Sequence, residues 1–510
     1  MTPPPRDRAP LLLGGAACAA AVALYAYTFW RPSLLQDDFQ ILAASRTWPL
    51  TRANLWVPNN EHAMPLGRLL TFAVVEAAGR ATRFPLAAAV VGPAALVAAM
   101  LLTYRFVRRE LGHPLYGLLA MSIFGVSAVY QQAVFWFAAS FSVVALDTLL
   151  LGLLAAQSYR LTGRRAFLLL CALWCAVAPC WFAIGVLAGP LCALYLVSDP
   201  RPSGSGGDSS RSLTLAVLKH LGDAAVPLVG TAAFLSVSLP LTAAAIVHLE
   251  HYRIQDTDAI QAFQPGKGFL MSLRSIVENL LLGLVGVTDV TVPVPLVVAA
   301  LLALAAFGVW WWWRAPCRRL LLLGVGLIGA SYLLVYSARA NWADDLSLVG
   351  VSWSRYHLLP QLGLALFVVG GLPAWNGRLF LLQADGRLTR RQVRFVACLI
   401  GVLMLIHLPR SVTATVRFEP MPFDFRTSKV APPDAQHAAL RRVDEVDARC
   451  REHGISADAA KRVLPWLSIP GTSPQGAPGE INGWILLAGS AAPRAPETRS
   501  DEEIRRLLEE

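Results

Sequence analysis

Charged residues are scarce in this sequence of 510 residues: Asp, Glu, Lys and Arg make up 15% of it, and hydrophobic residues 55%. A soluble domain carries roughly a quarter charged residues, so this composition excludes an ordinary water-soluble protein. Apolar runs of about twenty residues, the length that spans a bilayer, recur along most of the chain. The sequence therefore predicts an all-α membrane protein.

Cysteine is also sparse, with eight residues spread along the chain. Cys171 and Cys175 stand one helical turn apart, but no histidine or second cysteine pair accompanies them at the spacing of a metal site. The sequence thus supports neither a zinc site nor a disulfide framework, and we expect most cysteines to act as small hydrophobic residues. An internal repeat and a glycine-rich phosphate loop are absent as well.

Eleven apolar segments are expected to cross the membrane, the first as an uncleaved N-terminal helix. The net charge of +11 is explained by basic residues in the loops on one side, which the positive-inside rule places in the cytoplasm, and we expect no nucleic-acid partner. The predicted spans are Leu11 to Trp30, Phe84 to Tyr104, Pro114 to Tyr130, Ala133 to Gln157, Ala166 to Pro179, Phe182 to Val197, Ala224 to Val247, Val292 to Trp313, Leu320 to Ser337, His357 to Leu372 and Phe395 to Leu408.

With the N-terminus inside, the tight arginine clusters all fall on the cytoplasmic side, as in Arg105/Arg108/Arg109 and Arg160/Arg164/Arg165. Residues 1–408 are then a polytopic membrane domain, and residues 409–510 are an extracytoplasmic tail that we expect to be small or partly disordered. The absence of organelle signals suggests the inner (plasma) membrane of a cell with an envelope.

The first long outside loop carries the most informative residues. Asp37 and Asp38 follow the first helix closely, and Glu61-His62 precede Pro65, which opens an amphipathic stretch from Leu66 to Ala78. An adjacent acid pair is often a helix cap. Here, however, acids, a histidine and Arg68 can meet at one depth of the membrane surface. The loop is therefore a candidate catalytic region.

This pattern resembles the C-type superfamily of membrane glycosyltransferases, which includes protein O-mannosyltransferases and lipid A aminoarabinose transferases. The resemblance lies in the acidic pair after the first helix and in the Asn/Glu-His-x-x-Pro-Leu segment that leads into a juxtamembrane helix. Ser354-Arg355-Tyr356-His357, which enters the tenth span, is similar to an Arg-Tyr element of bacterial members. The resemblance implies a bundle of about eleven membrane helices with an extracytoplasmic juxtamembrane helix.

The resemblance also implies transfer of a sugar, with inversion, from a polyprenyl-phosphate donor to a glycan, lipid or protein acceptor in the cell envelope. A phosphate leaving group needs cationic neutralisation, and an acceptor hydroxyl needs a base. The expected roles follow. The base is Asp38 or Asp37, the donor phosphate is bound by Arg355, Arg339 and Arg68, and substrate contacts come from His62, Glu61, Tyr356 and His357.

The sequence also permits other functions and other roles for its polar residues. The acids are adjacent rather than separated, and the loop has no Asp-x-Asp, so we expect no metal or other cofactor. Asp147, inside a span, suits a paired structural carboxylate as well as a functional one, and Glu278 suits a donor cavity or an interfacial helix. A transporter or lipid flippase is the main alternative function, because such proteins bind substrates near the membrane midplane. A non-catalytic scaffold and another lipid-linked polymerase or ligase are further alternatives.

Overall fold

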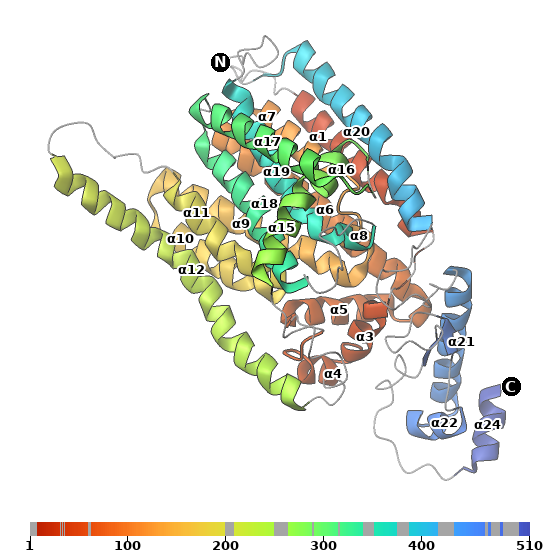
Figure 1. Ribbon diagram of the computed structural model, residues 1–510. Coiled ribbons are helices and arrows are strands. Elements are labelled where there is room, and N and C mark those ends of the chain that lie inside the picture. Colours follow the sequence, from red (N-terminus) through yellow and green to blue (C-terminus); the bar gives the residue numbers. More distant parts are fainter. Residues whose placement is uncertain are drawn as a thin grey trace, which may run out of the picture.

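The computed structural model describes residues 8–30, 32, 34, 36–59, 63–198, 209–248, 264–287, 290–314, 317–339, 351–374, 387–416, 433–464, 468–470, 480–482 and 499–509. These ranges are mainly helical (Figure 1). The elements are α1 (Ala9–Leu24), α2 (Ala26–Trp30), α3 (Gln36–Ala44), α4 (Trp48–Ala53), α5 (Pro65–Ala78), η1 (Ala81–Arg83), α6 (Phe84–Leu111), α7 (Pro114–Gly125), α8 (Gln132–Phe135), α9 (Phe137–Thr162), α10 (Arg165–Val177), η2 (Ala178–Cys180), η3 (Ala183–Leu187), α11 (Ala188–Val197), α12 (Ser209–His248), α15 (Pro265–Ser275), η4 (Ile276–Leu281), α16 (Leu282–Leu284), α17 (Val294–Arg314), α18 (Arg318–Arg339), η6 (Val351–His357), α19 (Leu358–Gly371), η7 (Leu372–Ala374), α20 (Arg390–Val416), α21 (Pro433–Glu452), α22 (Ala457–Val463), β1 (Ser468–Pro470), β2 (Glu480–Asn482) and α24 (Asp501–Glu509).

Six helices in the described ranges are long and apolar enough to cross a bilayer. They lie at 81–111, 137–162, 221–244, 294–314, 318–338 and 390–412, and shorter apolar helices lie at 9–24, 114–125, 165–180 and 183–197. The tenth of the eleven predicted spans, at 357–372, coincides with α19, which has 14 residues. The all-α membrane class is therefore confirmed, whereas the number of crossings stays a prediction.

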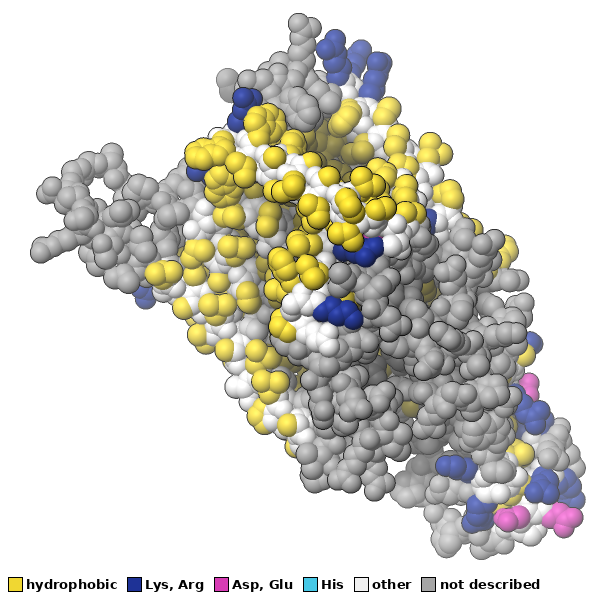
Figure 2. Space-filling model, viewed as in Figure 1, with side chains coloured by type: hydrophobic (Ala, Val, Ile, Leu, Met, Phe, Trp, Pro, Cys, Tyr) yellow, Lys and Arg dark blue, Asp and Glu magenta, His cyan; other side chains and the backbone are white. Residues whose placement is uncertain are grey.

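Large apolar side chains are exposed on the outer helices, where lipid would cover them. On α17 and α20, Leu302 is 66% exposed, Trp313 74% and Leu405 78%. Hydrophobic side chains cover much of the visible face in Figure 2, and the acidic side chains seen there gather mainly on the tail helices. A water-soluble protein would not present so large an apolar surface.

The helices are interrupted within the third and fourth predicted spans, which were expected at 114–130 and 133–157. The third ends early, at Gly125, and the fourth is divided into α8 and α9 at Trp136, whose backbone is extended (φ −90°, ψ 117°). Side chains satisfy the backbone groups of the turn: Ser127 Oγ accepts from Val129 N at 3.2 Å, and Ser354 Oγ accepts from Gln132 N at 3.0 Å. The break leaves the first N–H groups of α9 available to other partners.

The tail includes a packed helical part. Leu440, Val443 and Ile504, from α21 and α24, belong to one buried hydrophobic cluster with Phe39 and Ile41 of α3. In Figure 1 the tail helices lie beside the end of the molecule that carries α3, α4 and α5, and the N-terminus lies at the opposite end. The preceding helix α20 continues past the expected boundary at residue 408 to Val416. Which end faces the cytoplasm stays a prediction.

Candidate active site

The junction between α8 and α9 organises the candidate site, and Asp38 is bound to it. Asp38 lies in the first turn of α3 and is 1% exposed. Its Oδ1 accepts a hydrogen bond from the Ala138 backbone N at 2.8 Å. A carboxylate at a helix N-terminus interacts favourably with the unpaired N–H groups and the helix dipole. Asp38 thus caps α9, a helix a hundred residues away, rather than a short helix of its own.

Arg355 binds the same junction. Its Nη1 donates to Gln132 Oε1 at 3.1 Å, and its guanidinium carbon lies 5.0 Å from the centre of the Trp136 ring. Tyr356 supports the same guanidinium, because its hydroxyl accepts from Nη2 at 3.0 Å and its ring centre lies 4.6 Å from the guanidinium carbon. Aromatic faces and a neutral amide therefore hold this arginine in one orientation.

The fold brings Asp38 and Arg355 to the same short stretch of chain although they lie 317 positions apart in the sequence. Asp38 contacts Ala138, and Arg355 contacts Trp136, two residues earlier in the chain. An acid and a cation are thus anchored on one short stretch, residues 132–138. Their roles as a base and a phosphate-binding residue stay predictions.

Two buried polar groups at the same junction have no hydrogen-bond partner within the described part of the chain. They are the side-chain amide of Gln131, which is 0% exposed, and the indole N–H of Trp136, which is 5% exposed. Buried polar groups are nearly always hydrogen-bonded in native proteins, because leaving one unpaired costs about 1–3 kcal/mol. Unpaired groups at this position can therefore bind hydroxyl groups of a ligand or ordered water.

Arg68 reaches the site region from α5, the expected juxtamembrane helix, which begins at Pro65 and is capped at its C-terminal end by Gly79, with a positive φ of 67°. Arg68 is 3% exposed, and its Nη2 lies 3.4 Å from the Val57 carbonyl oxygen. A β-carbon added to Gly67 would lie 3.0 Å from the Phe141 ring of α9, so the two helices approach closely here. The arginine is therefore buried under the loop that also holds Asp38.

The tail holds the same loop through two polar contacts. Gln436 of α21 accepts from Leu34 N at 2.9 Å and donates to Leu34 O at 3.1 Å. Asp444 accepts from Ala81 N at 2.7 Å and from Thr82 N at 3.0 Å, with a further bond of 2.6 Å from the Thr82 hydroxyl. Leu34 lies two residues before α3, so Gln436 fixes the chain four residues before Asp38.

Electrostatic contacts link the tail to the turn between α3 and α4. Burial lowers the pKa of Arg46 to about 10; the nearby Arg451 lowers it as well, whereas Asp444 raises it. Arg46 stays charged at neutral pH at this value. The tail thus places both a like charge, Arg451, and an opposite charge, Asp444, close enough to affect this cation.

The other predicted site residues fall into two groups. His357 is 2% exposed and shares a hydrogen bond of 3.0 Å between its Nδ1 and the Tyr332 hydroxyl, so in this structure it is packed inside the bundle. Its role as a substrate contact stays a prediction, as does that of Tyr356. Glu61 and His62 and the side chains of Asp37 and Arg339 lie outside the described residues.

The acids that the sequence singled out inside apolar segments have different surroundings. Glu278 accepts from Arg274 Nε at 2.6 Å and from Val292 N at 2.7 Å, which makes it part of a buried ion pair at a π-helical turn. Asp147, on α9, has one carboxylate oxygen that is buried without a hydrogen-bond partner among the described residues. Glu278 therefore has a structural role, whereas one Asp147 oxygen remains available to bind a further group.

Sequence reasoning missed Gln132, Trp136, Gln436 and Asp444. The pair Gln131-Gln132 between two apolar spans was the available signal for the junction, because polar residues there need partners. No comparable signal exists for Gln436 and Asp444. They lie in a polar helix whose contacts with Leu34 and Thr82 join segments more than three hundred residues apart.

Neither a protein-family model nor a curated protein sequence matches this chain. Among solved structures, the apo form of an oligosaccharyltransferase from Archaeoglobus fulgidus is similar to it, with a TM-score of 0.46 and 13% sequence identity. The match covers 92% of this chain and 61% of that chain, so this chain spans less than two thirds of that protein's length.

Proposed function

We propose that this protein is a membrane glycosyltransferase that moves a sugar from a polyprenyl-phosphate donor to an envelope glycan, lipid or protein on the extracytoplasmic face, with inversion. The observation that carries the proposal is the convergence of Asp38 and Arg355 on residues 132–138. A buried acid and a fixed arginine beside unpaired polar groups suit transfer to a hydroxyl better than passage of a solute through the bundle.

In the proposed reaction the acceptor hydroxyl oxygen attacks the anomeric carbon as the bond from that carbon to the donor phosphate oxygen breaks. Asp38 takes the hydroxyl proton, and polyprenyl phosphate leaves with the electron pair. Arg355, with Arg68 and Arg339, would neutralise the charge on the leaving phosphate. The amide of Gln131 and the indole N–H of Trp136 would hold sugar hydroxyls. The proposal needs no metal or other cofactor.

One of the two Asp38 oxygens caps α9, and a carboxylate offers about four acceptor positions, so capping and base catalysis are compatible. Substitutions can separate the two roles. Asp38→Asn keeps an acceptor oxygen for Ala138 N and removes the base, whereas Asp38→Ala removes both. Arg355→Lys keeps the charge but loses the planar, stacked guanidinium.

The test uses the full-length protein in nanodiscs with radiolabelled polyprenyl-phosphate sugars and envelope extract. We expect transfer by the wild type, and a loss of about a hundredfold or more in Asp38→Asn and in Arg355→Ala, without a change in melting temperature. Arg80→Ala, at an exposed position before η1, is the matched control. Equal transfer by Asp38→Asn and wild type would reduce Asp38 to a helix cap. Donor binding without transfer across the panel would contradict the enzyme and favour the flippase alternative.

A further inference from the structure

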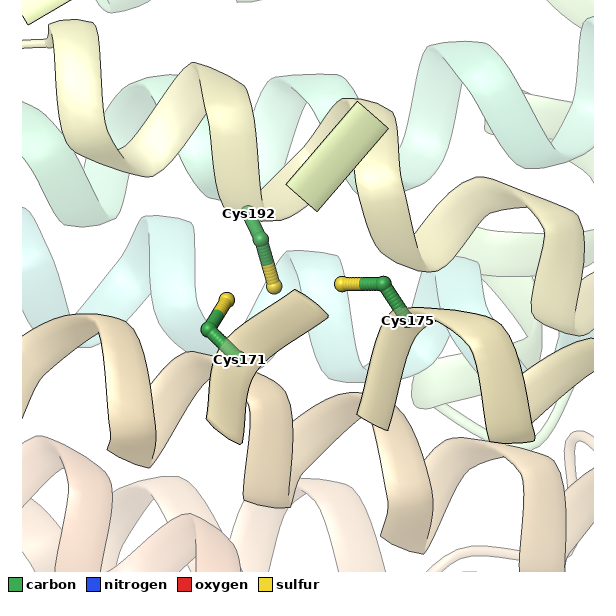
Figure 3. Close-up of side chains that lie close together, drawn as sticks. All are labelled: Cys171, Cys175 and Cys192. Carbon is green, nitrogen blue, oxygen red and sulfur yellow. The ribbon is translucent and has the colours of Figure 1, made fainter. Parts of the chain in front are cut away.

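Three buried cysteines converge in the interior of the bundle, far in sequence from the residues of the candidate active site. Cys171 and Cys175 lie one turn apart on α10, and Cys192 projects toward them from α11 (Figure 3). All three are 0% exposed, and their sulfur atoms lie within 4.8 Å of one another. The third sulfur, supplied from another helix, is what the sequence spacing could not reveal.

The geometry is close to that of three sulfurs around one metal ion. Thiolate–metal bonds measure about 2.3 Å for zinc, so three sulfurs in a plane around an ion of that size would be about 4 Å apart. Sulfurs that already lie within 4.8 Å need shifts of less than about 1 Å to reach that arrangement. Side-chain rotations of this size leave the helices in place.

Neighbouring residues leave space for the three sulfurs and hold the backbone of the helices that carry them. Gly152 of α9 faces it, and a β-carbon there would lie 3.3 Å from Cys192 Sγ and 3.8 Å from Cys175 Sγ. The Thr231 hydroxyl of α12 donates to the Cys175 carbonyl at 3.2 Å and accepts from Gly189 N at 3.1 Å. The helices that carry the sulfurs are thus tied together beside them, which favours a preorganised site.

The ligand set selects the kind of ion. Sulfur ligands favour soft ions such as Cu(I) over Mg²⁺ or Ca²⁺. Zinc takes four ligands, and among the described residues no histidine or carboxylate joins the three sulfurs. A closed apolar site also disfavours net charge, and one thiolate with two thiols has the same magnitude of charge as a monovalent cation, with the opposite sign. These conditions together fit a monovalent soft ion.

We propose that Cys171, Cys175 and Cys192 form an intramembrane site for one Cu(I) ion, or for a chemically similar ion such as Ag(I). Binding replaces one thiol proton by the metal: a Cys S–H bond breaks, a Cys S–Cu bond forms, and the proton is released to solvent. The other two sulfurs complete a three-coordinate site without a change of oxidation state. The ion would join α10 and α11 to each other, and this inference does not depend on the proposed transfer reaction.

The test is an anaerobic titration of the full-length protein in nanodiscs with Cu(I), in competition with a chromophoric Cu(I) chelator. We expect one ion per chain, held by sulfur at about 2.3 Å in X-ray absorption spectra. Cys192→Ala should weaken binding by more than about a hundredfold, since even changes outside the ligand shell reach tens to a hundredfold. Cys398→Ala, at an exposed position on α20, should bind as the wild type does.

Three results would overturn the site: no ion retained by the wild type against the chelator, nitrogen or oxygen ligands in the spectra, or equal binding by Cys192→Ala and wild type. Each would mean that the three thiols only pack as small apolar groups. Because Cys192→Ala leaves a small cavity, its melting temperature is compared with that of the metal-free wild type. Cys175→Ser, which keeps nearly the same volume, repeats the test if the alanine variant is unstable.

Discussion

The contact between Gln436 and Leu34 offers a sharp test of the idea that the tail shapes the active-site loop. Gln436→Ala removes two hydrogen bonds, of 2.9 and 3.1 Å, and leaves the Leu34 N–H and C=O without these partners at a position where Leu34 is 2% exposed. Each lost bond contributes about 1 kcal/mol, and each unpaired buried group costs about 1–3 kcal/mol. With two groups left unpaired, we therefore expect the docked arrangement to be destabilised by about 2–6 kcal/mol.

Hydrogen exchange at the Leu34 amide measures this loss directly. At about 1.36 kcal/mol per decade, the expected destabilisation raises the exchange rate roughly 30- to 30,000-fold. His437→Ala is the matched control, because the neighbouring side chain is exposed on the same helix. If Leu34 exchanges at the same rate in both variants, Gln436 does not hold the loop, and the tail has no part in placing Asp38.

Three further predictions concern separate parts of the molecule. A β-carbon at Gly92 would clash with the backbone oxygen of Val134 in α8, so Gly92→Ala should displace α8. We expect this variant to lower transfer in the nanodisc assay at least tenfold. Gly401→Ala, at a position with open space around it, should leave transfer unchanged. Glu110→Ala removes the carboxylate that pairs with Arg319 at 3.1 Å and with Arg160 at 3.4 Å. Denaturant titration should show a free energy of unfolding lowered by about 3–5 kcal/mol. Glu76→Ala, at an exposed position, should not show this loss. Burial raises the pKa of Cys450 to about 11, so its alkylation rate should keep rising with pH up to about that value, and a plateau near pH 9 would contradict the packing of α21.

The membrane helices could be predicted from the sequence because lipid imposes a local rule. An apolar run of sufficient length is sufficient evidence for a helix, whatever its neighbours. The amphipathic helix at 66–78 was predictable for a similar reason, since Pro65 marks its start and apolar residues recur on one face, and the structure places α5 at Pro65–Ala78. These signals all lie within one turn or one face of a helix.

The partners of each site residue could not be predicted, because they are set by contacts across the chain. Asp38 had the signature of a cap, but the helix that it caps begins at Phe137. The division of the fourth span at Trp136 depends on support from Ser354 and on the close approach of Gly92 to α8. Neither the acid pair nor the apolar pattern contains information about these neighbours.

Contacts between residues far apart in the sequence have a testable consequence for the tail. If Gln436 acts on transfer through the position of Asp38, then Gln436→Ala should lower kcat in the wild type and leave the KM of the donor nearly unchanged. In the Asp38→Asn background, whose residual transfer no longer uses this carboxylate as a base, the same tail substitution should have little further effect. Independent roles would instead give additive losses in the double variant. An additive result, together with a normal Leu34 exchange rate, would place the tail outside the catalytic machinery and leave it as a separate packing unit on the loop.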